Sequence, residues 1–168
     1  GAATLAGSVT FADPVAGVVG AVSAANSLVG TSSNDRVGNS SLSSSSNGNY
    51  YLSTVSWNSN AGALTFVNPS SAALTGTVGA GNSLVGSATG DLIGGNGVQN
   101  LFNGKALVFS PGWNGGMGAV TWFDATTGTL GTVSATNSLV GSTAGDAVGS
   151  SGRTSAGNFV GIRSPNWD

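Results

Sequence analysis

The pentapeptide NSLVG occupies residues 26–30, 82–86 and 137–141 of this 168-residue chain, so its copies lie 56 and 55 residues apart. Two other elements keep this spacing. An Asp opens an Asp-x-(Val/Ile)-Gly element at positions 35, 91 and 146, and a strand-like segment reads GSVTF at 7–11, GALTF at 62–66 and GAVTW at 118–122. Agreement between three anchors identifies a tandem repeat of about 56 residues.

The composition favours strands joined by tight turns. Glu is absent, Lys and Gln occur once each, and there are 29 glycines. Such a chain disfavours helices, and its many Ser, Thr, Asn and Val residues favour short strands. Asn47-Gly48 and Asn103-Gly104 are typical hairpin turns. The sequence therefore predicts an all-β fold with about four strands in each repeat.

The NSLVG motif has a structural interpretation. Adjacent Leu and Val residues point to opposite faces of a strand, so each copy contributes to two neighbouring intersheet layers. The Asn caps the preceding turn, and the Gly gives the backbone freedom to leave the strand. Identical neighbours would bury both faces by pressing equivalent Leu–Val pairs together. Leu84 and Leu139 are therefore expected in the core.

The phase of the repeat splits one unit between the two ends of the chain. SPNWD (164–168) joined to GAATLAGSVTF (1–11) parallels SPGWNGGMGAVTW (110–122). The predicted units are 35–90, 91–145, and 146–168 joined with 1–34 of a single repeat domain. Closed radial folds fasten their rings in this way, and neighbouring subunits of a polymer clasp each other in this way. Propellers need about 4–8 blades. Three arrangements therefore stay open: a six-bladed ring of two chains, a β-prism-like or β-trefoil-like closure, and a segment of a longer array.

These motifs resemble two groups of known proteins. The order Asp-x-Val-Gly, NGN, SPxW and GAVTW is similar to the FG-GAP blade of integrin-type β-propellers. It also resembles the tandem repeats of large bacterial haemagglutinin-like surface adhesins. The resemblance covers the whole chain and implies propeller-blade-like units. Val37, Ile93 and Val148 stand where the FG-GAP element has Phe, and the Asp-x-Asp-x-Asp calcium loop of that family is missing.

Two sets of recurring side chains are candidate site residues. Asp35, Asp91 and Asp146 form either a ring of carboxylates or, as we expect, hydrogen bonds to backbone amides in the turns before their strands. Trp57, Trp113 and Trp167 either stack on sugars or, as we expect, fill the space between sheets. Asn26, Asn82 and Asn137 complete the set of structural repeat positions.

The composition excludes several functions. His, Cys and Glu are absent, so neither a nucleophilic triad nor a zinc site can be built, and we expect no enzyme, metal or cofactor. Four scattered basic residues and a net charge of −2 argue against nucleic-acid binding and membrane insertion. A surface of Ser, Thr, Asn and Gly with little Lys is typical of secreted adhesins and fibres. We therefore expect an extracellular or cell-surface structural or adhesive module that self-associates into an oligomer or filament. The alternative is a carbohydrate-binding lectin that uses the Trp loops.

Overall fold

The structure is a computed structural model that describes residues 3–45, 47–69, 74–102, 104–151, 153–156 and 159–168. Its strands are β1 (Ser8–Val9), β2 (Leu28–Val29), β3 (Leu42–Ser44), β4 (Tyr50–Thr54), β5 (Ala63–Val67), β6 (Gly76–Thr77), β7 (Ser83–Val85), β8 (Val98–Asn100), β9 (Lys105–Ser110), β10 (Ala119–Asp124), β11 (Gly131–Thr132), β12 (Ser138–Val140), β13 (Arg153–Ala156) and β14 (Phe159–Ile162). The predicted all-β fold is confirmed. One residue of the predicted Asn103-Gly104 hairpin turn, Asn103, lies outside the described residues.

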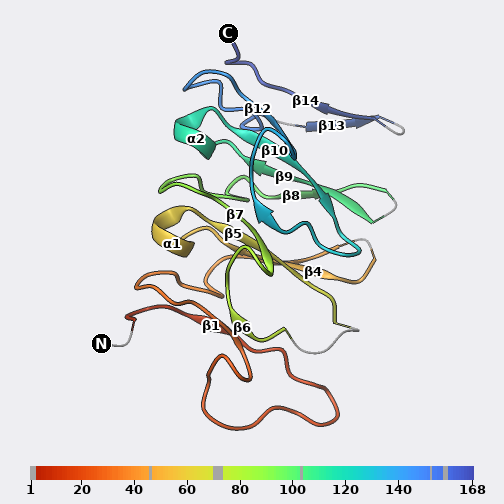
Figure 1. Cartoon of the computed structure of the whole chain (residues 1–168). Helices are drawn as coiled ribbons and strands as arrows, with labels where there is room; N and C mark the ends of the chain where they lie inside the picture. Colours follow the sequence, from red (N-terminus) through yellow and green to blue (C-terminus); the bar gives the residue numbers. More distant parts are fainter. Residues whose placement is uncertain (1–2, 46, 70–73, 103, 152, 157–158) are drawn as a thin grey trace.

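The strands form four sheets that stack along the chain from the N-terminal to the C-terminal end (Figure 1). The first sheet has the order β1-β2-β6, and the second has the order β11-β7-β5-β4-β3. The third has the order β12-β10-β9-β8, and the fourth consists of β13 and β14. Each complete repeat thus supplies four strands that pair antiparallel with one another. The molecule is an open stack of these four sheets.

Two short strands, β6 and β11, each connect a repeat to the sheet before it. β6 lies between β5 and β7 in sequence but pairs in parallel with β2 of the first sheet. β11 pairs in parallel with β7 of the second sheet in the same way. After each of these strands a Val buries its side chain, and the amides of Val78 and Val133 donate to the carbonyls of Val29 and Val85. A repeat is therefore fastened to its predecessor by backbone pairing as well as by side-chain contact.

The apolar side chains gather between the sheets, as the alternation of strand residues requires. Leu28 and Val85 share the cluster between the first and second sheets. Leu84 lies in the cluster between the second and third sheets, against which Val140 packs. The predicted contact of Leu and Val from successive repeats is confirmed at both interfaces. A smaller cluster around Phe109 joins the third and fourth sheets.

Leu139 does not lie in the core, although the repeat predicts it. Its side chain is 54% exposed, whereas Leu84 is 0% exposed. Leu139 is on β12, and the two strands of the fourth sheet pack over β9 and β10 instead, around Phe109 and Val120. The outer side of β12 is therefore left without a covering strand.

The segments labelled α1 (Trp57–Asn60) and α2 (Trp113–Gly116) in Figure 1 are single turns. Asn58 and Ser59 in the first, and Asn114 and Gly115 in the second, have positive φ. These segments are therefore not right-handed helices. No helix in the described part of the chain is long and apolar enough to cross a membrane.

The two halves of the predicted split unit lie at opposite ends of the stack (Figure 1). β1 and β2 belong to the first sheet, and β13 and β14 form the fourth. Within the described residues no strand pairs the two ends, so the β-prism-like or β-trefoil-like closure within one chain is not observed. Sheets that stack face to face and are connected only to their neighbours keep the ends apart.

Candidate functional site

The repeated Asp residues clasp successive repeats. The amides of Ser87 and Ala88 each donate to Oδ2 of Asp91 at 2.9 Å, and the amide of Asn114 donates to Oδ1 at 2.9 Å. Asp91 is 1% exposed. Asn114 belongs to the Trp turn between β9 and β10 of the third sheet, whereas Ser87 and Ala88 follow β7 of the second. One carboxylate therefore connects the second sheet to the third.

The first Asp makes the same contacts. Asp35 accepts from the amides of Thr31 and Ser32 at 2.9 and 2.8 Å, and from the amide of Asn58 at 2.8 Å. The expected backbone-capping role is confirmed for both residues. Because Asp35, Asp91 and Asp146 belong to successive repeats, they do not form a ring, and no group of three metal-ligating side chains occurs among the described residues.

Asp146 has an incomplete set of partners. The amides of Ser142 and Thr143 donate to Oδ2 at 2.8 and 3.0 Å, but Oδ1 is buried without a partner among the described residues. The hydrogen bond from Thr143 is the main reason why the pKa of Asp146 lies below its usual value. Asp168, which follows Trp167 as Asn114 follows Trp113, lowers this pKa slightly through its backbone amide without completing the contact on Oδ1. Asp146 therefore keeps the hydrogen bonds within its own turn but lacks the one on Oδ1 that Asp35 and Asp91 accept from the Trp turn.

The Asn of NSLVG organises the turn before its strand, as predicted. Oδ1 of Asn82 accepts from the amide of Gly79 at 3.0 Å, and its Nδ2 donates to the carbonyl of Thr77 at 2.9 Å. The Ser83 hydroxyl donates to the same Oδ1 and shares a 2.7 Å hydrogen bond with Thr65 of the neighbouring strand. The same network surrounds Asn26 and Asn137.

The Gly of NSLVG has a different role from the one predicted. Gly30, Gly86 and Gly141 do not have the positive φ that would call for glycine. Instead, a Cβ at Gly86 would collide with the carbonyl oxygen of Ala61. The same collision would occur with Ala6 at Gly30 and with Met117 at Gly141. Glycine is required because two backbones approach each other closely.

The three Trp residues have unequal surroundings. Trp57 packs against the cluster between the first and second sheets, and Trp113 against the next one. Trp167, in the last repeat, is 65% exposed. The expected filling of intersheet space therefore holds for Trp57 and Trp113 but not for Trp167.

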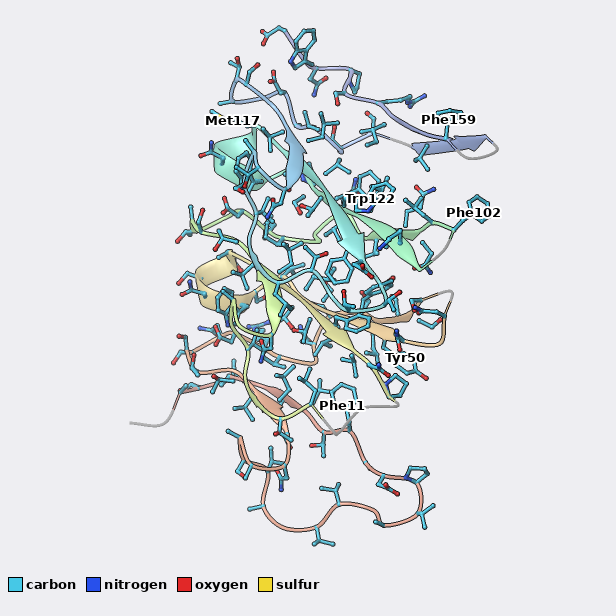
Figure 2. The ribbon with its side chains drawn as sticks, turned by 45° about the vertical axis from the view of Figure 1, so that its right-hand side comes forward. Phe11, Tyr50, Phe102, Met117, Trp122 and Phe159 are labelled. Carbon is cyan, nitrogen blue, oxygen red and sulfur yellow. The ribbon has the colours of Figure 1, made fainter. Side chains whose placement is uncertain are left out.

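The outer side of the third sheet exposes large apolar side chains beside the cluster around Phe109. Trp122 is 56% exposed and lies at the level between the third and fourth sheets in Figure 2. Its equivalent Phe66 is partly buried and tilts against Phe123, with ring centroids 6.3 Å apart. Leu139 lies opposite Val120, so Trp122, two residues further along β10, is diagonal to Leu139 on the same face of the sheet. These two exposed side chains are here called the C-terminal face.

The first sheet exposes a second apolar region. Val22 precedes Asn26 by four residues, as Val78 and Val133 precede Asn82 and Asn137. Val22 is 63% exposed, whereas Val78 and Val133 are 4% and 2% exposed. This side of the first sheet, here called the N-terminal face, thus exposes a residue that inner repeats bury. The sequence repeat contained this signal, but a repeat pattern alone does not show which copies are covered.

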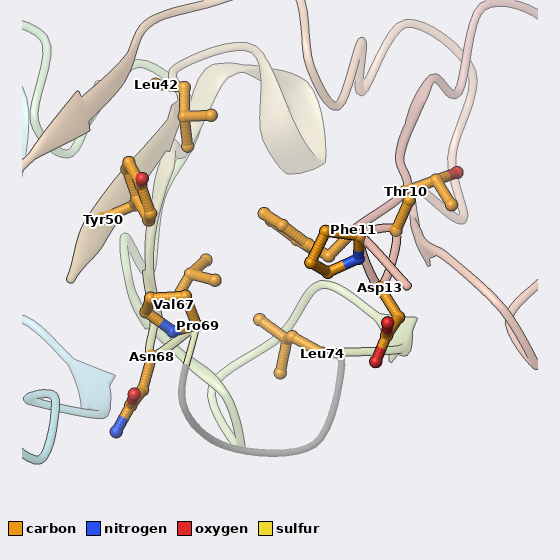
Figure 3. Close-up of a pocket in the computed structure, with 11 residues that line it drawn as sticks. Thr10, Phe11, Asp13, Leu42, Tyr50, Val67, Asn68, Pro69 and Leu74 are labelled. Carbon is orange, nitrogen blue, oxygen red and sulfur yellow. The ribbon is translucent and has the colours of Figure 1, made fainter. Parts of the chain in front are cut away.

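A cavity of about 640 Å³ lies between the first and second sheets. Thr10, Phe11 and Asp13 line one side, and Leu42, Tyr50 and Val67 line the other (Figure 3). The next interface is filled at this level by Tyr51, whose ring packs edge-on against Phe123 at 5.6 Å. The first sheet has no equivalent of the β4 strand that carries Tyr51. The cavity thus marks the place of a strand that the first sheet lacks.

Among the described residues, one ion pair lies beside the turn that follows β10. Lys105 and Asp124 form an ion pair of 2.6 Å on paired strands. The Lys105 hydrogen bond, with help from the amide of Thr126, lowers the pKa of Asp124 to about 2. Asp13 occupies the equivalent position and accepts from the amides of Val15 and Ala16, which lower its pKa. These groups stabilise turns.

The segments 1–39, 44–95 and 100–150 match the family model described as a repeat of unknown function (DUF5650). The chain belongs to this family. Each matched segment ends just after an Asp-x-(Val/Ile)-Gly element, so one DUF5650 repeat ends at the residue that clasps the next. Comparison with curated proteins and with solved structures finds no match.

Proposed function

We propose that this chain is a structural or adhesive module of an extracellular or cell-surface protein, and that it associates with itself through the ends of its stack. The observation that carries the proposal is the exposure of Leu139 and Trp122 at positions equivalent to the buried Leu84 and the partly buried Phe66. Exposed contiguous apolar surface on a soluble domain commonly marks an interaction site. The repeat architecture and its resemblance to haemagglutinin-like adhesin arrays and FG-GAP blades support an adhesive or scaffolding role.

The chemistry of the chain supports the same proposal. Without His, Cys or Glu, the chain lacks several of the side chains that enzymes most often use as acids, bases and nucleophiles. The Asp carboxylates of the first two repeats are fully engaged with backbone amides. These repeated Asp carboxylates therefore have a structural role, which supports a structural rather than a catalytic function.

The carbohydrate-binding alternative has a weaker basis. Stacking on a sugar ring requires an exposed aromatic face, but the side chains of Trp57 and Trp113 are partly buried against the clusters between the sheets. Trp167 alone of the three has a largely exposed side chain. Three equivalent sugar sites are therefore not expected.

Light scattering over a concentration series tests the proposal. We expect the mass to rise above that of the 16.1 kDa chain as the concentration rises. Because the contacts are apolar and the net charge is only −2, this mass should change little between low and molar salt. A monomer at every concentration would contradict self-association, and dissociation at high salt would show that charge holds the copies together.

A further inference from the structure

The two ends of the stack carry opposite halves of one repeat, each with an unpaired strand edge. Within the described residues β1 pairs only with β2, and β14 pairs only with β13. In the complete repeats the strands equivalent to β14 and β1 pair antiparallel, as β9 does with β10. An unpaired edge exposes backbone donors and acceptors that another strand can satisfy.

The complete repeats define the register of this missing pairing. Ala119 lies opposite Ser110, and Ala63 lies opposite Thr54. Ser8 is the residue equivalent to Ala119, because GSVTF corresponds to GAVTW. Ser164 is the residue equivalent to Ser110, because SPNWD corresponds to SPGWN. A second copy that repeats the internal pairing would therefore place its Ser8 opposite Ser164 of the first.

A second strand contact follows from the parallel connections between sheets. β6 and β11 each begin with a glycine of positive φ, Gly76 and Gly131, six residues before the Asn of NSLVG. Gly20 has the same spacing from Asn26 and the same positive φ. Its equivalents pair with the NSLVG strand of the preceding sheet. The corresponding strand for Gly20 is β12, with Leu139, in another copy.

The apolar residues of the two faces agree with this arrangement. Leu84 and Phe66 are covered by the third and fourth strands of the next repeat, β10 and β12. β1 and β2 are the equivalents of β10 and β12 in the first sheet, and Val22 accompanies them. A second copy would therefore lay its N-terminal face over Trp122 and Leu139.

The cavity supplies a third point of agreement. In the second sheet, Nδ2 of Asn49 donates to the carbonyl of Ala125 at 2.9 Å across the interface. Phe159 is the equivalent of Asn49, and Pro69 is the equivalent of Ala125. Phe159 is 82% exposed on the hairpin β13–β14 (Figure 2), and Pro69 lines the cavity. The internal geometry thus directs Phe159 of one copy into the cavity of the next.

We propose that two copies of this chain associate head to tail, with β14 of one copy added to β1 of the next and Gly20–Ala21 of the second copy added to β12 of the first. The joined strands β13, β14, β1 and β2 form one complete repeat, and Phe159 fills the cavity. The interface is heterologous, so repetition of it produces an open filament unless the rotation closes a ring. This inference rests on the proposed self-association and specifies its geometry.

Engineered disulfides test the register, since the chain has no cysteine of its own. In the Ser8→Cys/Ser164→Cys variant, the two thiols of one molecule lie far apart, at the two ends of the stack. In the proposed assembly, the Cys at position 8 of one copy faces the Cys at position 164 of another. Mild oxidation should give a ladder of covalent multimers on a denaturing gel, which reducing agent collapses. The matched control is Ser8→Cys/Arg163→Cys, because Arg163 is one residue out of register and points to the other face. It should give at least about tenfold less covalent multimer.

Light scattering on the unmodified chain and on two further variants completes the test. Val22→Asp removes the contact with β12 and should weaken association by about tenfold or more. Ala80→Asp, at an exposed position in the turn between β6 and β7 and outside the proposed interface, should leave it unchanged. Circular dichroism checks that both variants fold. If Val22→Asp leaves the strength of association unchanged, or if both cysteine pairs cross-link equally, the head-to-tail geometry is overturned. The proposed function would still stand. A chain that stays monomeric would overturn both.

Discussion

Leu84 and Leu139 occupy the same position of the same motif, on β7 and β12 of two neighbouring sheets. The turns that precede them are alike, because Asn82 and Asn137 make the same hydrogen bonds. Their burial is opposite, at 0% for Leu84 and 54% for Leu139. The local hydrogen bonding of a repeat is thus fixed within the repeat itself. The burial of its apolar residues is decided by the next sheet.

Alanine substitution at these two leucines should give the largest contrast. Leu84→Ala removes a fully buried side chain from the cluster with Val108 and Phe123 and should lower the free energy of unfolding by about 2–5 kcal/mol. Leu139→Ala should cost about 0.5 kcal/mol or less in the monomer. Urea unfolding at low protein concentration measures both. Equal losses at the two positions would mean that Leu139 is buried in solution by another contact.

The Asp clasps extend the comparison to polar groups. Asp91→Ala leaves three backbone amides without their acceptor and should cost about 3 kcal/mol. Asp146→Ala should cost less, because Oδ1 of Asp146 has no partner to lose. Thermal unfolding of the two variants measures the order. A larger loss at Asp146 would show that its last clasp is complete in solution.

Much of this fold was predictable from the sequence because it depends on local, repeated features. The spacing of NSLVG predicted the repeat, and the adjacent Leu and Val predicted contact with two neighbouring sheets, as Leu84 and Val85 show. The capping roles of Asp91 and Asn82 followed from the tendency of short polar side chains to bond to nearby amides. Such contacts span only a few residues.

The remainder depends on relations between repeats that a periodic sequence does not contain. Leu139 is exposed because the fourth sheet covers β9 and β10 and leaves β12 uncovered, and Val22 is exposed at the N-terminal end of the stack. The glycine of NSLVG was assigned to backbone freedom, yet Gly86 is needed because the carbonyl of Ala61 lies against it. The cavity beside Tyr50 arises from a missing neighbouring strand. None of these features can be predicted from the residue concerned and its neighbours in the sequence.

Glycine substitutions distinguish close approach from flexibility. Gly86→Ala would press a Cβ against the backbone of Ala61 and should cost about 1–3 kcal/mol. Gly79→Ala is the matched control, because no atom lies within 4 Å of its Cβ position and its φ is not positive. Chemical unfolding should find Gly79→Ala neutral or slightly stabilising. A neutral Gly86→Ala would mean that the two backbones separate easily at this point.

The smallest effect concerns the turns after the third strands, where Asp124 is paired with Lys105 and the equivalent Asp13 is not. Both carboxylates accept two backbone amides, but the hydrogen bond from Lys105 is the largest cause that lowers the pKa of Asp124 to about 2. Because this pKa is below the unfolded value of 3.8, the resulting stability is present above pH 3.8 and is lost as the pH falls through about 2. Both side chains are about one-third exposed, so the pair contributes only about 0.2–1 kcal/mol. Lys105→Met should therefore raise the pKa of Asp124 measured by NMR titration, leave that of Asp13 unchanged, and shift the acid unfolding curve only slightly. An unchanged pKa at Asp124 would assign its lowering to the amides of Thr126 and Thr127 alone.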